Sequence, residues 1–275
     1  MTEVVMARLY ELMIILYALS IVLYFIDYLY KNVKCRRVAF WIVSIVWVLQ
    51  TVFLMLFILE TKRFPILSLY EGVFIYAWLL TMLSIVLHCI VRVDLPVFFI
   101  NVLSFIFVTI HLFSPQSAQQ IVGESLISEM LMIHISFAIL SYAAFSVAFI
   151  FALLYLILYR LLKQKKLNNL WSRLPNLQQT LSWINYSTIV GVPLLLISLI
   201  LGLEWAFLTI EEVSIFDVKI MGSFIVSVVY LIIFLLHRKG TLLGTTYARV
   251  HIYLFLLVVV NFFLGSKLSN FHLWV

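Results

Sequence analysis

Eight apolar runs dominate this sequence, and each is long enough to cross the hydrocarbon core of a membrane, which takes about 20 helical residues. Hydrophobic residues occupy 65% of the 275 positions and charged residues 11%, which is more apolar surface than a soluble domain of this length can bury. Because strand-like alternation is missing and lipid offers the backbone no other partner, the runs are predicted to be helices. The sequence therefore predicts an all-α integral membrane protein, a single polytopic transmembrane domain over residues 1–275. Its helices are expected near residues 9–30, 38–59, 70–91, 95–113, 132–159, 186–208, 218–236 and 250–266.

Charge predicts how these helices are oriented. The intervening connections on one side are mostly acidic, whereas basic residues gather on the other side. By the positive-inside rule the basic side is cytoplasmic, so both termini are expected outside, an N-out/C-out topology. The net charge of +6 then indicates topology and attraction to anionic lipid rather than a nucleic-acid partner. The basic connections are residues 31–37, the turn near 92, residues 160–184 and residues 237–249.

The longest basic connection, residues 160–185, carries apolar residues at helical spacing. This pattern predicts a short segment near 170–184 that lies in the membrane interface and is interrupted near Pro175. Packing against the rest of the protein explains the segment more simply than a partner site does. Its periodic apolar residues are Leu170, Leu174, Leu177, Leu181 and Ile184.

The cysteines and the motifs limit the chemistry. Cys35 and Cys89 fall at the cytoplasmic side, where thiols stay reduced, and they form no C-x-x-C pair. A disulfide and covalent haem attachment are therefore not expected. The sequence contains no G-x-S-x-G, no H-E-x-x-H and no phosphate-binding glycine loop, so we do not expect an enzyme.

The six histidines remain as candidate functional residues, and all are expected at helix ends, which argues against a proton pump. His134 precedes a face of small side chains, so its ring should point into the bundle. His272 is expected at the same outer level, beside Phe271 and Trp274. Two such histidines suit a haem whose iron takes an imidazole on each side, and the same residues suit simple interfacial anchors. His111 is also expected at the outer ends, and His88, His237 and His251 at the inner ends.

Several segments resemble the CcsA/ResC cytochrome c assembly family, from about residue 65 to the end of the chain. They are "SLYEGVFIYAWLL", "HISFAILSYAAFSVAFIFALLYLILYRLLKQKK", "LLHRKG" and "LGSKLSNFH". The resemblance implies a bacterial cytoplasmic membrane protein that binds haem b without a covalent bond. It implies that His134 and His272 are the axial ligands of the haem iron and that His237 is the matching inner histidine.

The family's tryptophan-rich haem-handling loop corresponds to "LEWAFLTIEEVSIFDVK", which keeps Trp205, Asp217 and Lys219. Phe216 stands where the family has tryptophan, which argues against haem delivery to apocytochrome c more than against haem binding. The haem propionates need cations, and we favour Lys219 and Lys267 among those expected outside, although headgroup anchoring explains both lysines equally well. The other outer cations are Arg8, Lys62 and Arg63.

The amino-terminal segments "RLYELMIILYALSIVLYFIDYLY" and "VWVLQTVF" resemble an eight-helix branch of this family, encoded beside enzymes of tetrapyrrole biosynthesis. That branch is associated with limiting the amount of glutamyl-tRNA reductase, which implies a haem-dependent regulator acting through the basic loop 160–185. The alternative is a haem transporter or a subunit of cytochrome c assembly, in which haem passes from His88, His237 or His251 to the outer pair. A structural scaffold that has lost the ligand is the third possibility.

Overall fold

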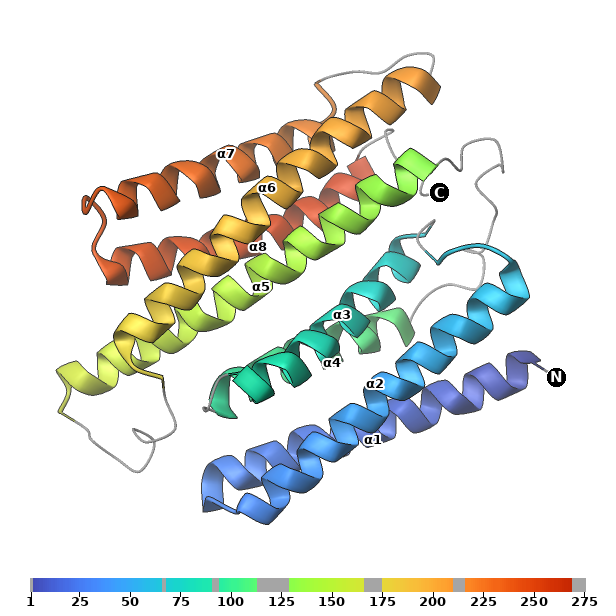
Figure 1. Ribbon diagram of the computed structural model, residues 1–275, viewed down its shortest axis with the longest axis horizontal. Helices are drawn as coiled ribbons and strands as arrows, with labels where there is room; N and C mark the ends of the chain where they lie inside the picture. Colours follow the sequence, from blue (N-terminus) through green and yellow to red (C-terminus); the bar gives the residue numbers. More distant parts are fainter. Residues whose placement is uncertain are drawn as a thin grey trace. The chain divides into compact units, whose positions relative to one another are not determined.

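The computed structural model in Figure 1 describes residues 2–65, 68–90, 94–112, 129–165, 175–209 and 216–268. Within these ranges the regular structure is helical, with eight helices and no strand. Each helix contains a stretch that is long and apolar enough to cross a membrane, so the all-α class and the eight-helix count are confirmed. The N-out/C-out orientation stays a prediction. The helices are α1 (Thr2–Tyr30), α2 (Val33–Thr61), α3 (Leu69–Ile90), α4 (Asp94–Leu112), α5 (Glu129–Lys163), α6 (Leu177–Thr209), α7 (Val218–Arg238) and α8 (Gly244–Leu268).

The contacts divide the chain into two units, residues 1–118 and residues 119–275, hereafter unit 1 and unit 2. In unit 1, α1 packs on α2 and α4, and α3 packs on the same two helices. In unit 2, α5 packs on α6 and α8, and α7 packs on the same two helices. Each unit is thus a four-helix bundle in which every helix has at least two neighbours. The single transmembrane domain over residues 1–275 stays a prediction.

Successive helices of unit 2 run in opposite directions, so the bundle has two distinct ends (Figure 1). The N-termini of α5 and α7 lie at one end together with the C-termini of α6 and α8. Figure 1 shows this arrangement, and two close approaches agree with it, because Gly202 on α6 lies against His134 on α5 and Gly222 on α7 lies against Asn261 on α8. We call this the His134 end of unit 2, and the opposite end the His251 end.

Residues 177–184 of the predicted interfacial segment form the first turns of α6, and the position of the segment in the membrane interface stays a prediction. A capping box starts this helix: the Gln179 backbone N–H donates to the Asn176 side chain at 2.7 Å, and the Asn176 N–H donates to the Gln179 side chain at 3.3 Å. Trp183 then stacks on Phe151 of α5, with ring centroids 5.4 Å apart, and Ile184 is fully buried. The apolar periodicity here therefore reflects packing on α5. Residues 170–174 lie outside the described part of the chain.

Four other helices also begin several residues before their predicted starts, among them α1 at Thr2 rather than near 9 and α2 at Val33 rather than near 38. The sequence predicts starts near 132 and 250, whereas α5 begins at Glu129 and α8 at Gly244. Gly244 in the extra turn of α8 lies close to α5, because a Cβ there would meet the Tyr155 hydroxyl. The apolar run thus marks the part of a helix inside lipid, and polar turns extend beyond it.

Candidate functional site

His134 lies in the second turn of α5, and only 8% of its surface is exposed. Its ring nitrogen Nδ1 is 2.5 Å from the backbone oxygen of Ser198 on α6 and 3.1 Å from the Ser198 hydroxyl. Because a carbonyl oxygen only accepts, Nδ1 carries a proton and donates it. The Ser198 hydroxyl donates in turn to the His134 backbone oxygen at 2.9 Å. An iron would therefore have to bind this imidazole through its other nitrogen, Nε2.

Gly202, one helical turn after Ser198, leaves room for the imidazole. A Cβ at this position would lie 2.5 Å from Cε1 of the His134 ring and 2.6 Å from Nδ1. Ordinary contacts are 3.4 Å or longer, so any side chain here would move the ring or separate the two helices. Ser198 and Gly202 therefore hold the imidazole from one face of α6.

The α5 face that begins at His134 is buried, as its small side chains predict. The ring of Phe145 on this face occupies the space above Gly191 of α6, where a Cβ would lie 2.6 Å from it. Phe145 also stacks on Tyr230 of α7, with centroids 4.1 Å apart and planes at 10°. The His134 backbone is thus fixed by a tightly packed helix pair. The buried residues of the face are His134, Ser141, Phe145, Ala148 and Ala152.

Three further candidate residues lie at the His134 end of unit 2. Trp205 is buried on α6, one turn beyond Gly202. Asp217 caps α7, because its side chain accepts the Lys219 backbone N–H at 2.8 Å. The Lys219 ammonium group lies within electrostatic range of both Asp217 and the His134 ring. The structure therefore places an imidazole, an indole and a cation from three helices at the same end of unit 2.

The remaining candidates at this end are only partly described. Lys267 falls in the last turn of α8, and its side chain is not described. His272 lies outside the described residues, so its pairing with His134 stays a prediction. Phe216 is 83% exposed in the turn before α7.

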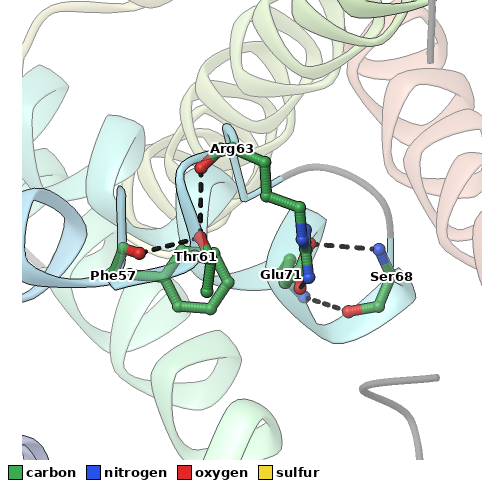
Figure 2. Close-up of polar contacts among 5 residues, drawn as sticks. All are labelled: Phe57, Thr61, Arg63, Ser68 and Glu71. Carbon is green, nitrogen blue, oxygen red and sulfur yellow. Dashed lines mark hydrogen bonds and ion pairs between the residues drawn. The ribbon is translucent and has the colours of Figure 1, made fainter. Parts of the chain in front are cut away.

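Two of the other predicted outer cations already have acidic partners inside unit 1. Figure 2 shows Arg63 facing Glu71, and the two guanidinium nitrogens lie 2.7 Å and 2.9 Å from the carboxylate oxygens. Glu71 also accepts the Ser68 backbone N–H at 3.3 Å, and Arg63 lies over the Phe57 ring at 5.2 Å. Arg8 pairs with Glu11 at 2.7 Å. Both arginines are therefore already engaged by carboxylates.

His237 and His251 lie at the opposite end of unit 2. His237 is 18 residues after Lys219 on α7, which is about 27 Å at 1.5 Å per residue. Its Nδ1 lies 3.1 Å from the Leu242 backbone oxygen, and its ring stacks on Tyr247 with centroids 3.9 Å apart. His237 therefore belongs to a separate cluster and cannot share an iron with His134.

His251 is fully buried and both of its ring nitrogens are engaged. Nδ1 donates to the Tyr247 backbone oxygen at 3.0 Å, and Nε2 lies 3.1 Å from the Thr188 hydroxyl. The Tyr247 hydroxyl extends this cluster by donating to the Asn185 side chain at 2.8 Å. His251 is thus a hydrogen-bonded packing residue, and a route for haem through it would require the core to open.

The two histidines of unit 1 lie against aromatic rings. His111 Nδ1 is 3.1 Å from the Tyr10 hydroxyl, which donates to the Val108 backbone oxygen at 2.6 Å. His88 stacks on Phe40, with centroids 4.3 Å apart. Among the residues that the structure describes, no three His, Cys, Asp or Glu side chains are grouped so that they could hold a metal ion. Cys35 and Cys89 are free thiols, as predicted.

Sequence reasoning did not identify Ser198, Gly202, Tyr247 or Thr188. The Ser-x-x-x-Gly spacing on α6 was the available signal for the first two, because small residues one turn apart mark close helix contacts. No comparable signal pointed to Tyr247 and Thr188, which become partners of His251 only when α6 and α8 pack.

Comparisons with known proteins agree with this architecture. Residues 66–272 match the family model described as cytochrome C assembly protein, as the sequence resemblance predicted. The chain is 44% identical over 274 residues to Protein HemX of Bacillus subtilis (strain 168), covering 99% of both chains. It is 35% identical over 265 residues to Protein HemX of Brevibacillus brevis, covering 96% of this chain and 97% of the relative. The chain therefore belongs to the HemX family, membrane proteins with a cytochrome c assembly domain.

A more distant relative is the cytochrome c biogenesis protein CcsA of Guillardia theta, which is 31% identical over 166 residues. That match covers 54% of this chain and 55% of the relative. The HemX matches, in contrast, extend over all eight helices, so they include unit 1 as well as unit 2.

Proposed function

We propose that this chain binds one haem b non-covalently at the His134 end of unit 2 and serves haem biosynthesis or haem supply. The observation that carries the proposal is the hydrogen bond from His134 Nδ1 to Ser198, because histidines that ligate metals usually donate their other ring nitrogen to a carbonyl. Gly202 holds the same ring in place on α6. Bound there, haem would supply an iron with exchangeable axial positions and an absorbance that reports them.

The residues around His134 have distinct roles in this proposal. His134 would give one neutral imidazole to the iron, and His272 would give the second, as the family resemblance implies. Lys219 would face a propionate, and Lys267 is proposed for the other. Trp205 would offer an apolar ring to the flat macrocycle. None of these roles requires the chain to be an enzyme.

We further propose that haem occupancy regulates a partner and that glutamyl-tRNA reductase is the enzyme whose amount is limited. The basic connection between α5 and α6 supports this, because it is the longest one on the side predicted to be cytoplasmic. Haem would act by favouring one arrangement of α5 and α6, the two helices that this loop joins. Bacterial relatives along the full chain favour the bacterial cytoplasmic membrane as its location.

A second candidate function is haem transport or haem handling in cytochrome c assembly. The distant CcsA relative favours it, and so does His237, whose Nδ1 is oriented on a carbonyl much as that of His134 is. In this case haem would pass between the two ends of unit 2. The hydrogen bonds of His251 count against a route through the centre of the bundle.

The test of the proposed function is haem titration of the purified chain in lipid nanodiscs, followed by flux measurements in vesicles. We expect saturation at one haem per chain with a shifted Soret band, and no flux of haem into vesicles. Absence of binding would refute the proposal, and flux would favour the transporter. Replacing residues 160–185 by a neutral linker should raise reductase levels in cells without changing haem affinity. An unchanged reductase level would show that this loop does not limit the reductase.

A further inference from the structure

Unit 1 carries a layer of buried polar side chains at the middle of its helices. α1 contributes Tyr17, α2 contributes Gln50, α3 contributes Thr81, and α4 contributes both Asn101 and Ser104. Each of the five is fully buried. Polar groups at this depth of a membrane bundle need partners, because lipid supplies none. We call these five residues the polar layer: Tyr17, Gln50, Thr81, Asn101 and Ser104.

The hydroxyl groups of the polar layer satisfy one another. The Tyr17 hydroxyl lies 3.2 Å from the Asn101 side-chain oxygen and 3.2 Å from the Thr81 hydroxyl. Thr81 and Ser104 are 2.9 Å apart, and each can also donate to the Ala77 backbone oxygen, at 2.9 Å and 2.8 Å respectively. This network joins α1, α3 and α4 and leaves α2 out.

The two carboxamides of the polar layer are not satisfied in this way. Neither the oxygen nor the nitrogen of the Gln50 side chain has a hydrogen-bond partner among the described residues, and the Asn101 nitrogen has none either. The Ser84 hydroxyl, one turn after Thr81 on α3, is also buried and without a partner there. Together these groups offer several N–H donors, one free carbonyl acceptor and one hydroxyl that can both donate and accept a hydrogen bond.

The same level of α2 shows that a polar group here can be satisfied by protein alone. Thr51, the neighbour of Gln50, donates to the Trp47 backbone oxygen at 2.8 Å and accepts the Trp78 indole N–H at 2.9 Å. This bond also places Gln50 near the level of Thr81. Gln50 and Asn101 thus keep unmet groups in the interior of unit 1, although the neighbouring Thr51 is satisfied by protein.

The chemistry of the unmet groups defines the ligand. They are uncharged, they include both donors and acceptors, and the layer itself contains no Asp, Glu, Lys, Arg or His. An ion would be uncompensated there, whereas a small neutral molecule that both donates and accepts would match. Internal water fits, since a buried water typically makes about 3 hydrogen bonds. We propose that unit 1 is a hydrated bundle, with internal water bound at the polar layer by the side chains of Gln50 and Asn101.

X-ray radiolytic labelling of the full-length protein in nanodiscs made with ¹⁸O-water tests this proposal. Ionised internal water produces hydroxyl radicals in place, so a side chain beside it is oxidised even when it is closed to bulk solvent. We expect rapid ¹⁸O incorporation at Tyr17, as at Tyr30, which is 77% exposed. Phe151, buried among apolar residues of unit 2, should stay unlabelled. An unlabelled Tyr17 at doses that label Tyr30 would overturn the proposal.

A matched pair of variants tests the assignment to Gln50. Gln50→Leu should reduce Tyr17 labelling to the level of Phe151, because the water loses its carboxamide partner. Thr51→Val removes a neighbouring hydroxyl whose bonds are to protein, so it should leave Tyr17 labelling unchanged. Labelling that persists in Gln50→Leu would overturn the assignment. If Gln50→Leu does not fold, Tyr17 labelling is measured in Asn101→Leu instead, which should reduce it relative to the wild type for the same reason.

Discussion

Replacing Gly202 by alanine tests how tightly α6 holds the proposed haem ligand. The added Cβ would lie 2.5 Å from Cε1 of His134, so the ring and α6 must separate by about 1 Å to reach an ordinary contact. The hydrogen bond from Nδ1 to Ser198, at 2.5 Å, cannot survive that displacement unchanged. Stability and haem affinity should therefore fall together.

The expected magnitude follows from two losses and one gain in stability on Gly202→Ala. Overpacking costs about 1–3 kcal/mol, and loss of the His134–Ser198 hydrogen bond adds about 1 kcal/mol. The gain in helix propensity returns up to about 1 kcal/mol. The net loss of about 1–3 kcal/mol corresponds to a fall in Tm of roughly 2–10 °C. Haem affinity should fall about 10–100-fold, as it does when an outer partner of a metal ligand is lost.

Gly72→Ala is the matched control, because nothing lies within 4 Å of a Cβ at that position of α3. It should leave haem affinity unchanged and raise Tm slightly through helix propensity. Thermal unfolding in detergent and haem titration by absorbance measure both quantities. If Gly202→Ala matched Gly72→Ala in Tm and in haem affinity, the close contact between α6 and His134 would be refuted.

Three further predictions concern charge. Reversing Lys219 to glutamate should weaken haem binding several-fold, whereas Lys239→Glu at the other end of α7 should not; equal effects would exclude Lys219 as a propionate partner. A double-mutant cycle between Arg63 and Glu71 should give a coupling energy of about 1–3 kcal/mol, since the pair is bidentate and mostly buried, and a coupling near zero would contradict that geometry. Reporter fusions should establish the N-out/C-out topology. Two consecutive fusions found on the opposite sides from those predicted would contradict the topology. The fusions expected to read as cytoplasmic follow Arg37, Arg92, Lys166 and Lys239, and those expected outside follow Lys62, Gln119, Glu212 and Val275.

Much of the fold was predictable because lipid imposes a simple rule on sequence. The ends of α3 and α7 lie within two residues of the apolar runs, since charged residues follow directly. The start of α6 was not predictable from hydropathy, because the Asn176–Gln179 capping box starts the helix inside a polar stretch. Capping side chains carry that information, and they are few and local.

The sequence predicted which face of α5 carries the candidate site, but it did not predict which atoms contact the His134 ring. Small residues after His134 indicated that its ring points inward, and it does. Which atoms meet the ring depends on the register between α5 and α6, which a one-dimensional pattern does not contain. For the same reason the sequence did not distinguish His251, whose nitrogens are both engaged, from the other inner histidines.

The most direct test of the central proposal is the absorption spectrum of the haem-loaded protein in three forms, wild type, His134→Ala and His237→Ala. Two imidazole ligands predict a six-coordinate, low-spin haem in the wild type. That spectrum should be lost in His134→Ala and kept in His237→Ala, because the two histidines lie at opposite ends of unit 2. A wild-type spectrum in His134→Ala together with its loss in His237→Ala would place the ligand at the His251 end and contradict the account.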